Sequence, residues 1–158
     1  NKEDKSQLSV IGVLRKVDTA SVLFFLGILL AVAGLQSAGQ LALMAGSLND
    51  LFDGNVYAIN IVIGLLSAIV DNVPLVAGSM GMYEITEAGD FAKDGIFWQF
   101  LAFCAGTGGS ALIIGSAAGV AVMGLEKIDF VWYLKKISIL ALIGYFAGAG
   151  TYILIQSL

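Results

Sequence analysis

The sequence has no histidine, one cysteine and one proline among its 158 residues, and only 13% of the residues are charged. Without histidine, His-based catalytic triads and Cys/His metal sites are excluded, and proton exchange near neutral pH requires a carboxylate whose pKa is raised by burial. The single cysteine, Cys104, cannot form a disulfide within the chain, and we expect it to be a small packing residue. These absences leave the carboxylates as the candidates for proton chemistry.

The scarcity of charge indicates a membrane protein. Soluble domains carry about 25% charged residues, whereas this chain is 58% hydrophobic and has a mean hydropathy of +0.91. Most of its charged residues fall in three stretches, 2–18, 84–94 and 126–136, with apolar blocks between them. The net charge of −4 is not that of a nucleic-acid-binding protein. We therefore predict an all-α integral membrane protein, with the lipid bilayer and no nucleic acid as a partner.

The apolar blocks divide the chain, which we interpret as a single transmembrane unit over 1–158. The predicted segments are a loop and interfacial segment at 1–18, a transmembrane helix at 19–36, an amphipathic or half-helix at 38–52, a re-entrant hairpin at 55–83, a broken transmembrane helix at 96–123 and a transmembrane helix at 137–156. Residues 129–136 are typical of an aromatic and basic interfacial belt, and Gly144 and Gly148 favour close helix packing. The polar start, without an initiator Met or a signal peptide, indicates the C-terminal portion of a longer protein.

The 55–83 run holds one charged side chain, Asp71, which is followed by Asn72 and by the only proline, Pro74. A carboxylate at bilayer depth is costly and usually marks an ion pathway or a proton relay. The alternative is an Asp that is paired so that it holds two helices together. As one straight helix the run would be about 43 Å long, against a hydrocarbon thickness of about 30 Å. Either a tilted, kinked span or a re-entrant hairpin, whose half-helices meet at Asp71–Pro74, would fit.

The positions of the basic residues favour the hairpin. Short cytoplasmic loops are enriched in Lys and Arg. The basic residues beside the predicted spans are Arg15, Lys16, Lys127, Lys135 and Lys136. With a hairpin they all lie on the cytoplasmic side and the C-terminus lies outside, whereas a full span at 55–83 puts the two groups on opposite sides. This inference requires that residues 38–52 do not cross the membrane.

A second interruption is predicted in the 96–123 run, within Gly106-Thr-Gly-Gly-Ser110. Each glycine weakens a helix by about 1 kcal/mol relative to alanine. We therefore expect Gly106, Gly108 and Gly109 to break the helix, and Thr107 to Ser110 to be non-helical and close to Asp71. Unwound backbone persists in a membrane only where protein buries it or where it lines a wet cavity. The alternative is close helix packing through small residues. A Walker loop is excluded because no lysine follows and no strand precedes.

Two interrupted membrane segments are typical of secondary transporters, in which half-helix ends and free carbonyls bind ions near the midplane. Asp71, Asn72 and Thr107 are the candidate ligands for a metal ion. Oxygen ligands of this kind suit Na⁺ or Li⁺ and do not suit a soft transition metal. A carboxylate that binds either a proton or a cation is sufficient for exchange of the two.

The two motifs also resemble those of a known family. Ser67-Ala-Ile-Val-Asp-Asn-Val-Pro74, followed by the small-residue run 106–119, resembles the C-terminal half of NhaD-type Na⁺/H⁺ antiporters of the ion transporter superfamily. The resemblance, which extends from about Arg15 onward, implies half of an inverted-repeat transporter with one re-entrant helical hairpin and one broken transmembrane helix. It implies a partner N-terminal half with a second Asp-Asn hairpin. It also implies that the ion site uses Ser67, Asp71, Asn72, Thr107, Ser110 and Ser116.

The expected function is exchange of Na⁺ or Li⁺ for H⁺ by a secondary active transporter, which is not an enzyme and needs no cofactor apart from the transported ions. We expect a homodimer in the bacterial inner membrane. One alternative is a superfamily relative that carries an anion such as a dicarboxylate or arsenite, although Asp71 would repel an anion. Another is a non-transporting scaffold subunit, although the loops are short. An intramembrane enzyme is poorly supported by one Asp without a histidine or a second catalytic acid.

Overall fold

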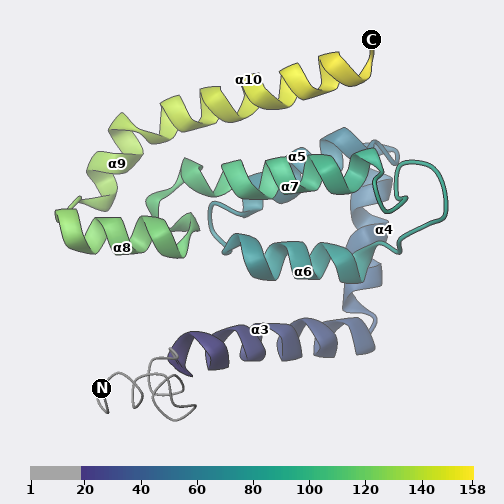
Figure 1. Cartoon of the computed structure of the whole chain (residues 1–158), viewed down its shortest axis with the longest axis horizontal. Coiled ribbons are helices and arrows are strands. Elements are labelled where there is room, and N and C mark those ends of the chain that lie inside the picture. The colour runs from purple at the N-terminus through teal and green to yellow at the C-terminus, as the bar shows by residue number, and fades with distance from the viewer. Residues whose placement is uncertain (1–18) are drawn as a thin grey trace, which may run out of the picture.

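The computed structural model describes residues 19–158, and its regular elements there are helices, with an isolated bridge between Thr86 and Ala92 in the loop that follows α6 (Figure 1). The elements are α3 (Thr19–Ser37), α4 (Gln40–Phe52), α5 (Val56–Leu66), α6 (Asn72–Met82), α7 (Ile96–Gly108), the 3₁₀ turns η1 (Gly109–Ala111) and η2 (Ile113–Gly115), α8 (Ala117–Glu126), α9 (Phe130–Lys136) and α10 (Ser138–Gln156). The predicted all-α class is confirmed for these residues. The interfacial segment predicted at 1–18 lies outside them.

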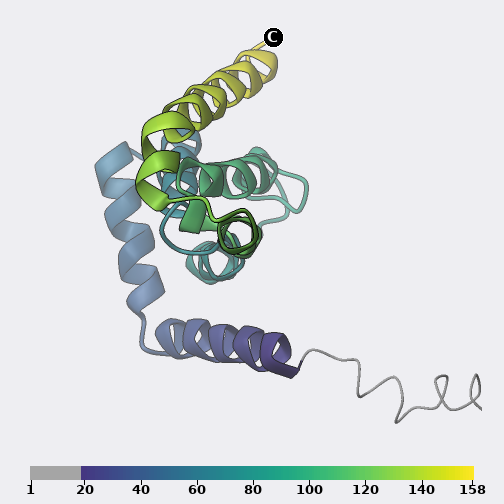
Figure 2. The same ribbon diagram turned by 90° about the vertical axis from the view of Figure 1, so that its left-hand side faces the viewer.

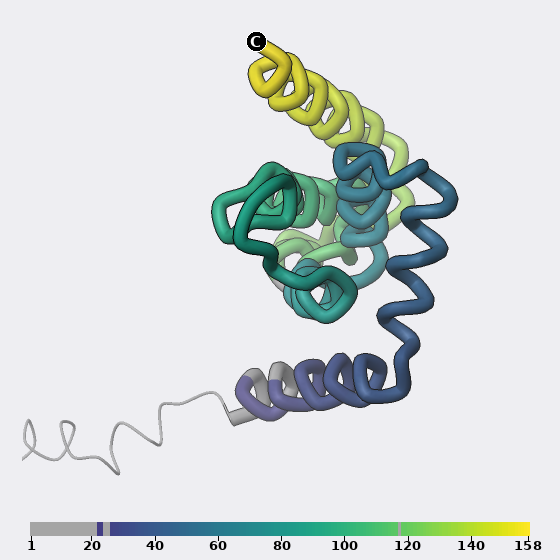
Figure 3. Tube along the Cα trace, turned by 90° about the vertical axis from the view of Figure 1, so that its right-hand side faces the viewer, coloured from purple at the N-terminus to yellow at the C-terminus, as the bar shows by residue number. Residues whose placement is uncertain are grey.

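Helices α3 and α4 form a bent pair. Gly39, between them, has a φ of 71°, a left-handed conformation that glycine adopts without a Cβ clash. The segments Leu26–Ser37 and Gln40–Phe52 meet at 74°, and α4 rises steeply from the end of α3 in the tube view (Figure 3). Figure 2 looks nearly along α6 and α8, and α4 stands across that direction. One face of α4 is buried through Leu41 and Ala45, while Leu43 and Leu51 are exposed.

Helices α5, α6 and α7 form the interior. Val56 at the start of α5, Tyr83 at the end of α6 and Phe97 at the start of α7 belong to one buried cluster. Because these residues meet, α6 turns back toward the end of the molecule at which α5 begins. The most extensive helix–helix contact in the described chain joins α5 and α7. A hydrogen bond from Asn60 Nδ2 to the Phe97 carbonyl, 3.1 Å long, links the two helices inside this contact.

The outer helices present apolar side chains to the surroundings. Leu23, Leu26 and Leu30 are exposed on α3, and Leu140 and Ile143 are exposed on α10. A protein in water normally buries such side chains, so exposed apolar faces of this kind suit contact with lipid chains. Of the described helices, only α10 has by itself the length and hydropathy for a membrane crossing, and the α3–α4 pair reaches both only across its bend.

Candidate functional site

The first interruption separates α5 from α6 and covers residues 67–71. Ser67 is fully buried, and its hydroxyl donates to the carbonyl of Gly64 over 2.6 Å. Ala68 is also buried, whereas Ile69 and Val70 are exposed. The interruption therefore begins inside the protein and reaches its surface before α6 starts.

Pro74 does not form this interruption. It occupies the first turn of α6, which begins at Asn72. A proline is tolerated there because the first amides of a helix have no helical acceptor. The prediction that Pro74 is a break residue, with the half-helices meeting at Asp71–Pro74, is therefore wrong in position: the chain leaves the helix at Ser67 and re-enters it at Asn72.

Asp71 is half-buried and is the N-cap of α6, where its carboxylate accepts a hydrogen bond of 2.9 Å from the amide of Asn72. A carboxylate at this position is stabilised by the free amides and by the positive end of the helix dipole. Among the residues that the structure describes, the side chain of Asp71 makes no hydrogen bond to another helix. The alternative of an Asp that ties two helices together therefore finds no partner within residues 19–158.

The second interruption separates α7 from α8. Gly106, Thr107 and Gly108 are α-helical, and the chain departs from α7 at Gly109. Its backbone becomes extended at Leu112, with φ −127° and ψ 141°, and at Ser116, with φ −150° and ψ 149°. The prediction of breaks at Gly106 and Gly108, and of non-helical structure from Thr107, is therefore wrong, whereas Gly109 and Ser110 lie in the 3₁₀ turn η1.

Packing explains why Gly108 stays helical. A Cβ at Gly108 would overlap the backbone of Gly64, and one at Gly115 would overlap the backbones of Gly109 and Ala68. These positions need glycine because another backbone segment approaches closely, which is the role of small residues where helices meet. Gly106, in contrast, has nothing within 4 Å of where its Cβ would stand. The alternative reading of the motif, close packing through small residues, therefore holds for Gly108.

The two interruptions touch each other. Gly108 contacts Ser67 as well as Gly64, Gly109 faces the carbonyl of Ser67, and Gly115 lies against Ala68. The contact thus runs through Ser67 and Ala68, and among the described contacts none joins Asp71 itself to the second interruption. Of the predicted site residues, the structure brings Ser67 and Gly108–Gly109 into contact.

The remaining predicted ligands are engaged locally. Thr107 Oγ1 donates to the Phe103 carbonyl and Ser110 Oγ to the Thr107 carbonyl, each over 2.6 Å. Ser116 Oγ accepts from the Gly119 amide at 3.0 Å and caps α8. A hydroxyl that donates its hydrogen keeps oxygen lone pairs, so Thr107 and Ser110 retain acceptors that a cation would use. Within residues 19–158 no group of three His, Cys, Asp or Glu side chains converges.

Three polar side chains, on α5, α9 and α10, were not predicted as part of the site. Asn60 is fully buried, and its Oδ1 has no hydrogen-bond partner among the described residues. The hydroxyl of Tyr145 donates to the Ile61 carbonyl, and that of Tyr133 donates to the Ser110 carbonyl. Asn60 stands out in sequence as an amide within an apolar run. The tyrosines carry no such signal, because both lie in segments that are typical of belts and spans.

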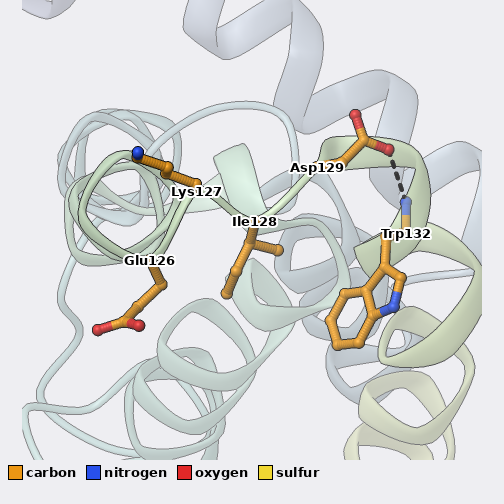
Figure 4. Close-up of a pocket in the computed structure, with 5 residues that line it drawn as sticks. All are labelled: Glu126, Lys127, Ile128, Asp129 and Trp132. Atoms are coloured by element: carbon orange, nitrogen blue, oxygen red, sulfur yellow. Dashed lines mark hydrogen bonds between the residues drawn. The ribbon is translucent and has the colours of Figure 1, made fainter.

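A hollow of about 300 Å³ lies at the corner between α8 and α9 and is lined by Glu126, Lys127, Ile128, Asp129 and Trp132. Figure 4 shows that Lys127 and Glu126 point to different sides, while Asp129 accepts a hydrogen bond of 3.1 Å from the amide of Trp132 and caps α9. None of these residues belongs to either interruption. The hollow shares Asp129 and Trp132 with the predicted interfacial belt and is not part of the candidate ion site.

Comparison with known proteins gives relatives along nearly the whole chain. It is 52% identical over 157 residues to sodium/proton antiporter 1 of Arabidopsis thaliana and 47% over 154 residues to sodium/proton antiporter 2 of the same plant. It is 36% identical over 155 residues to the Na⁺/H⁺ antiporter NhaD of Vibrio cholerae. These alignments cover 99%, 98% and 91% of this chain but 27%, 36% and 30% of the relatives, so the chain spans about a third of their length.

No solved structure matches the chain. The sequence model of the family described as citrate transporter (CitMHS) matches residues 5–98. That range includes α3 to α6, the first interruption and the start of α7. Because the match covers more than half of the chain, the chain belongs to the citrate transporter family, within the ion transporter superfamily that its two motifs resemble.

Proposed function

We propose that this chain is part of the C-terminal half of a secondary active transporter that exchanges Na⁺ or Li⁺ for H⁺. The observation that carries the proposal is the place of Asp71: a half-buried carboxylate at an interruption whose other residues contact a second interruption. The relatives named as sodium/proton antiporters support the same chemistry. Asp71 binds either a proton or the cation, and each displaces the other. Asn72 and the Ser67, Thr107, Ser110 and Ser116 hydroxyls serve as neutral ligands.

The proposed membrane arrangement has α3 and α10 as crossings, α7 and α8 as one broken crossing, and α5 and α6 as a re-entrant hairpin. The return of α6 toward the start of α5 supports the hairpin. The start of α3 and the corner between α8 and α9 lie at one end of the molecule, and the C-terminus lies at the other (Figure 1). With the first end cytoplasmic, Lys127, Lys135 and Lys136 satisfy the preference of basic residues for that side. Helix α4 then lies across the membrane normal without crossing.

The proposal also covers the part of the transporter that lies outside this chain. An N-terminal half, related by an inverted repeat, supplies a second Asp-Asn hairpin and completes the ion site, and the transporter is a homodimer in the lipid bilayer. The transported ions are its only small-molecule requirement, and it carries no enzymatic activity. The relatives come from a plant as well as from bacteria, so the bacterial inner membrane stays a prediction.

Anion transport is the second candidate, because the matching family is described as citrate transporter. Helix N-termini bind anions through their free amides, and the start of α6 would be such a place. In this chain, however, the Asp71 carboxylate already occupies that position and accepts the amide of Asn72. A citrate carboxylate would meet a negative charge there, which favours a cation.

Asp71→Asn in the full-length transporter tests the proposal in proteoliposomes. Asparagine keeps the side-chain oxygen that caps α6 and removes the titratable charge, so we expect the protein to insert normally and to lose Na⁺-driven proton movement by at least about 100-fold, the effect typical of removing an essential proton-transfer group. The matched control is Asp129→Asn, because Asp129 caps α9 with a similar hydrogen bond but is exposed.

Undiminished exchange in Asp71→Asn contradicts the proposal and moves the proton-carrying role to another residue. Loss of exchange in both variants would contradict a role specific to Asp71, because Asp129→Asn makes the same change at a helix cap outside the proposed site. Uptake of radiolabelled citrate by the wild-type protein, without Na⁺-driven proton movement, would establish the anion carrier.

A further inference from the structure

Two tyrosines from the C-terminal arm, defined as α9 and α10, donate hydroxyl hydrogen bonds to the backbone near the two interruptions. Tyr145 in α10 donates to the Ile61 carbonyl in the middle of α5, over 2.8 Å. Tyr133 in α9 donates to the Ser110 carbonyl in η1, over 2.9 Å. The two bonds connect residues 84 and 23 positions apart in sequence, so neither is a local turn contact.

The Tyr145 hydroxyl lies deep in the protein. The residue is 2% exposed and packs with Phe100 and Cys104 in a buried cluster. Its hydroxyl also lies against Gly64, where a Cβ would overlap it. A buried hydroxyl without a hydrogen-bond partner costs free energy, so this hydrogen bond stabilises the folded arrangement. It fixes α10 against the part of α5 that leads directly to Ser67.

The Tyr133 hydroxyl reaches the second interruption from outside. Ser110 lies where the α-helical hydrogen-bond pattern of α7 has ended, and carbonyls at such ends need other donors. Tyr133 supplies that donor, and the Ser110 hydroxyl bonds to Thr107 on the other side. The position of this carbonyl therefore depends on α9, a seven-residue helix anchored by the Asp129 cap.

We propose that Tyr133 and Tyr145 are positioning residues that hold the second interruption and the end of α5 in the relative geometry in which the cation binds. The inference rests on the proposed exchange of Na⁺ or Li⁺ for H⁺ at Asp71. Neither hydroxyl touches the ion. Each restrains a backbone segment that leads to an ion ligand, Ser67 in one case and Ser110 in the other, so together they set how closely the site fits ions of different radius.

The test is removal of each hydroxyl in the full-length transporter by Tyr133→Phe and Tyr145→Phe, with Na⁺/H⁺ and Li⁺/H⁺ exchange measured in proteoliposomes. Loss of one hydrogen bond that orders a site weakens binding by about three- to tenfold. We expect the KM for Na⁺ to rise by that factor with kcat within about twofold, and the ratio of the Na⁺ and Li⁺ KM values to change. Tyr152→Phe is the matched control, because its hydroxyl bonds to Gln99 at 3.2 Å, away from both interruptions, and it should leave both KM values unchanged.

Unchanged KM values and an unchanged Na⁺ to Li⁺ ratio in both variants would overturn the inference, as would an equal change in Tyr152→Phe. A fall in kcat alone, with less folded protein, would show a purely structural role and would also overturn it.

A second readout keeps this inference separate from the proposed function. Amide hydrogen exchange of residues 109–116 in the full-length protein requires no transport. Tyr133→Phe should speed that exchange about threefold or more relative to wild type and to Tyr152→Phe. If the wild-type protein exchanges neither Na⁺ nor Li⁺ for H⁺, the proposed function fails, and with it the role in the cation site. Unaltered amide exchange at 109–116 overturns the restraint by Tyr133 whether or not transport is seen.

Discussion

The two interruptions are built differently. The first, at 67–71, contains no glycine and ends in a carboxylate that caps the next helix. The second, at 109–116, contains no charged residue and depends on glycines at which other backbone segments approach closely. One interruption therefore carries the carboxylate that we propose exchanges a proton for a cation, and the other supplies a close-packed surface against Ser67 and Ala68. The division suggests that ion chemistry and scaffold support are separable by mutation.

The largest expected difference between the two interruptions concerns membrane topology. A hairpin at the first interruption and a crossing at the second put Glu87 and Lys127 on opposite sides of the membrane. We expect Glu87→Cys to react with a membrane-impermeant maleimide only from the non-cytoplasmic side and Lys127→Cys only from the cytoplasmic side. Cys104, the one cysteine of this chain, is buried, so this chain should contribute little background. Labelling of Glu87→Cys only from the cytoplasmic side would show that the first interruption does not turn the chain back, and labelling of both positions from one side would show that residues 96–123 do not cross.

A stability comparison within the second interruption gives the next largest effect. Gly108→Ala places a methyl group against the backbone of Gly64, and overpacking of this kind costs about 1–3 kcal/mol. Gly106→Ala adds the same methyl group where nothing lies within 4 Å, and helix propensity there favours alanine by up to about 1 kcal/mol. Thermal unfolding of the purified full-length protein should therefore separate the two variants in opposite directions. Equal midpoints would contradict the close approach of α5 and α7.

The smallest effect separates charge from capping at the first interruption. Asp71→Ala removes both the charge and the cap and should lower stability by about 1 kcal/mol, whereas Asp71→Asn should stay within a few tenths of wild type. The two variants should nevertheless lose transport alike. Thermal unfolding of both proteins under the same conditions provides the measurement. A loss of stability in Asp71→Asn as large as that in Asp71→Ala would mean that the charge itself stabilises α6.

The sequence predicted the positions of the two interruptions more accurately than it predicted the residues that form them. The lone carboxylate in a 29-residue apolar run marked the first interruption, and the glycine cluster marked the second to within a few residues. It misplaced Pro74, because a proline in the first turn of a helix and a proline that breaks a helix are alike in sequence. It also missed Tyr133 and Tyr145, whose partners are backbone carbonyls that carry no sequence signal.

The amino-acid sequence by itself indicated that this protein is helical and belongs in a membrane, since nearly all of its charge falls in short stretches between long apolar blocks. It also predicted that Asp71 is the residue that carries a charge within the membrane. Only the tertiary structure decided that Gly106–Gly108 stay helical while the chain unwinds beyond them, because the contact of Gly108 with Gly64 stabilises a conformation that local propensity disfavours. It likewise decided that Ser67 and Ala68, and not Asp71, form the contact between the interruptions, since contacts between distant segments depend on how α5 packs on α7.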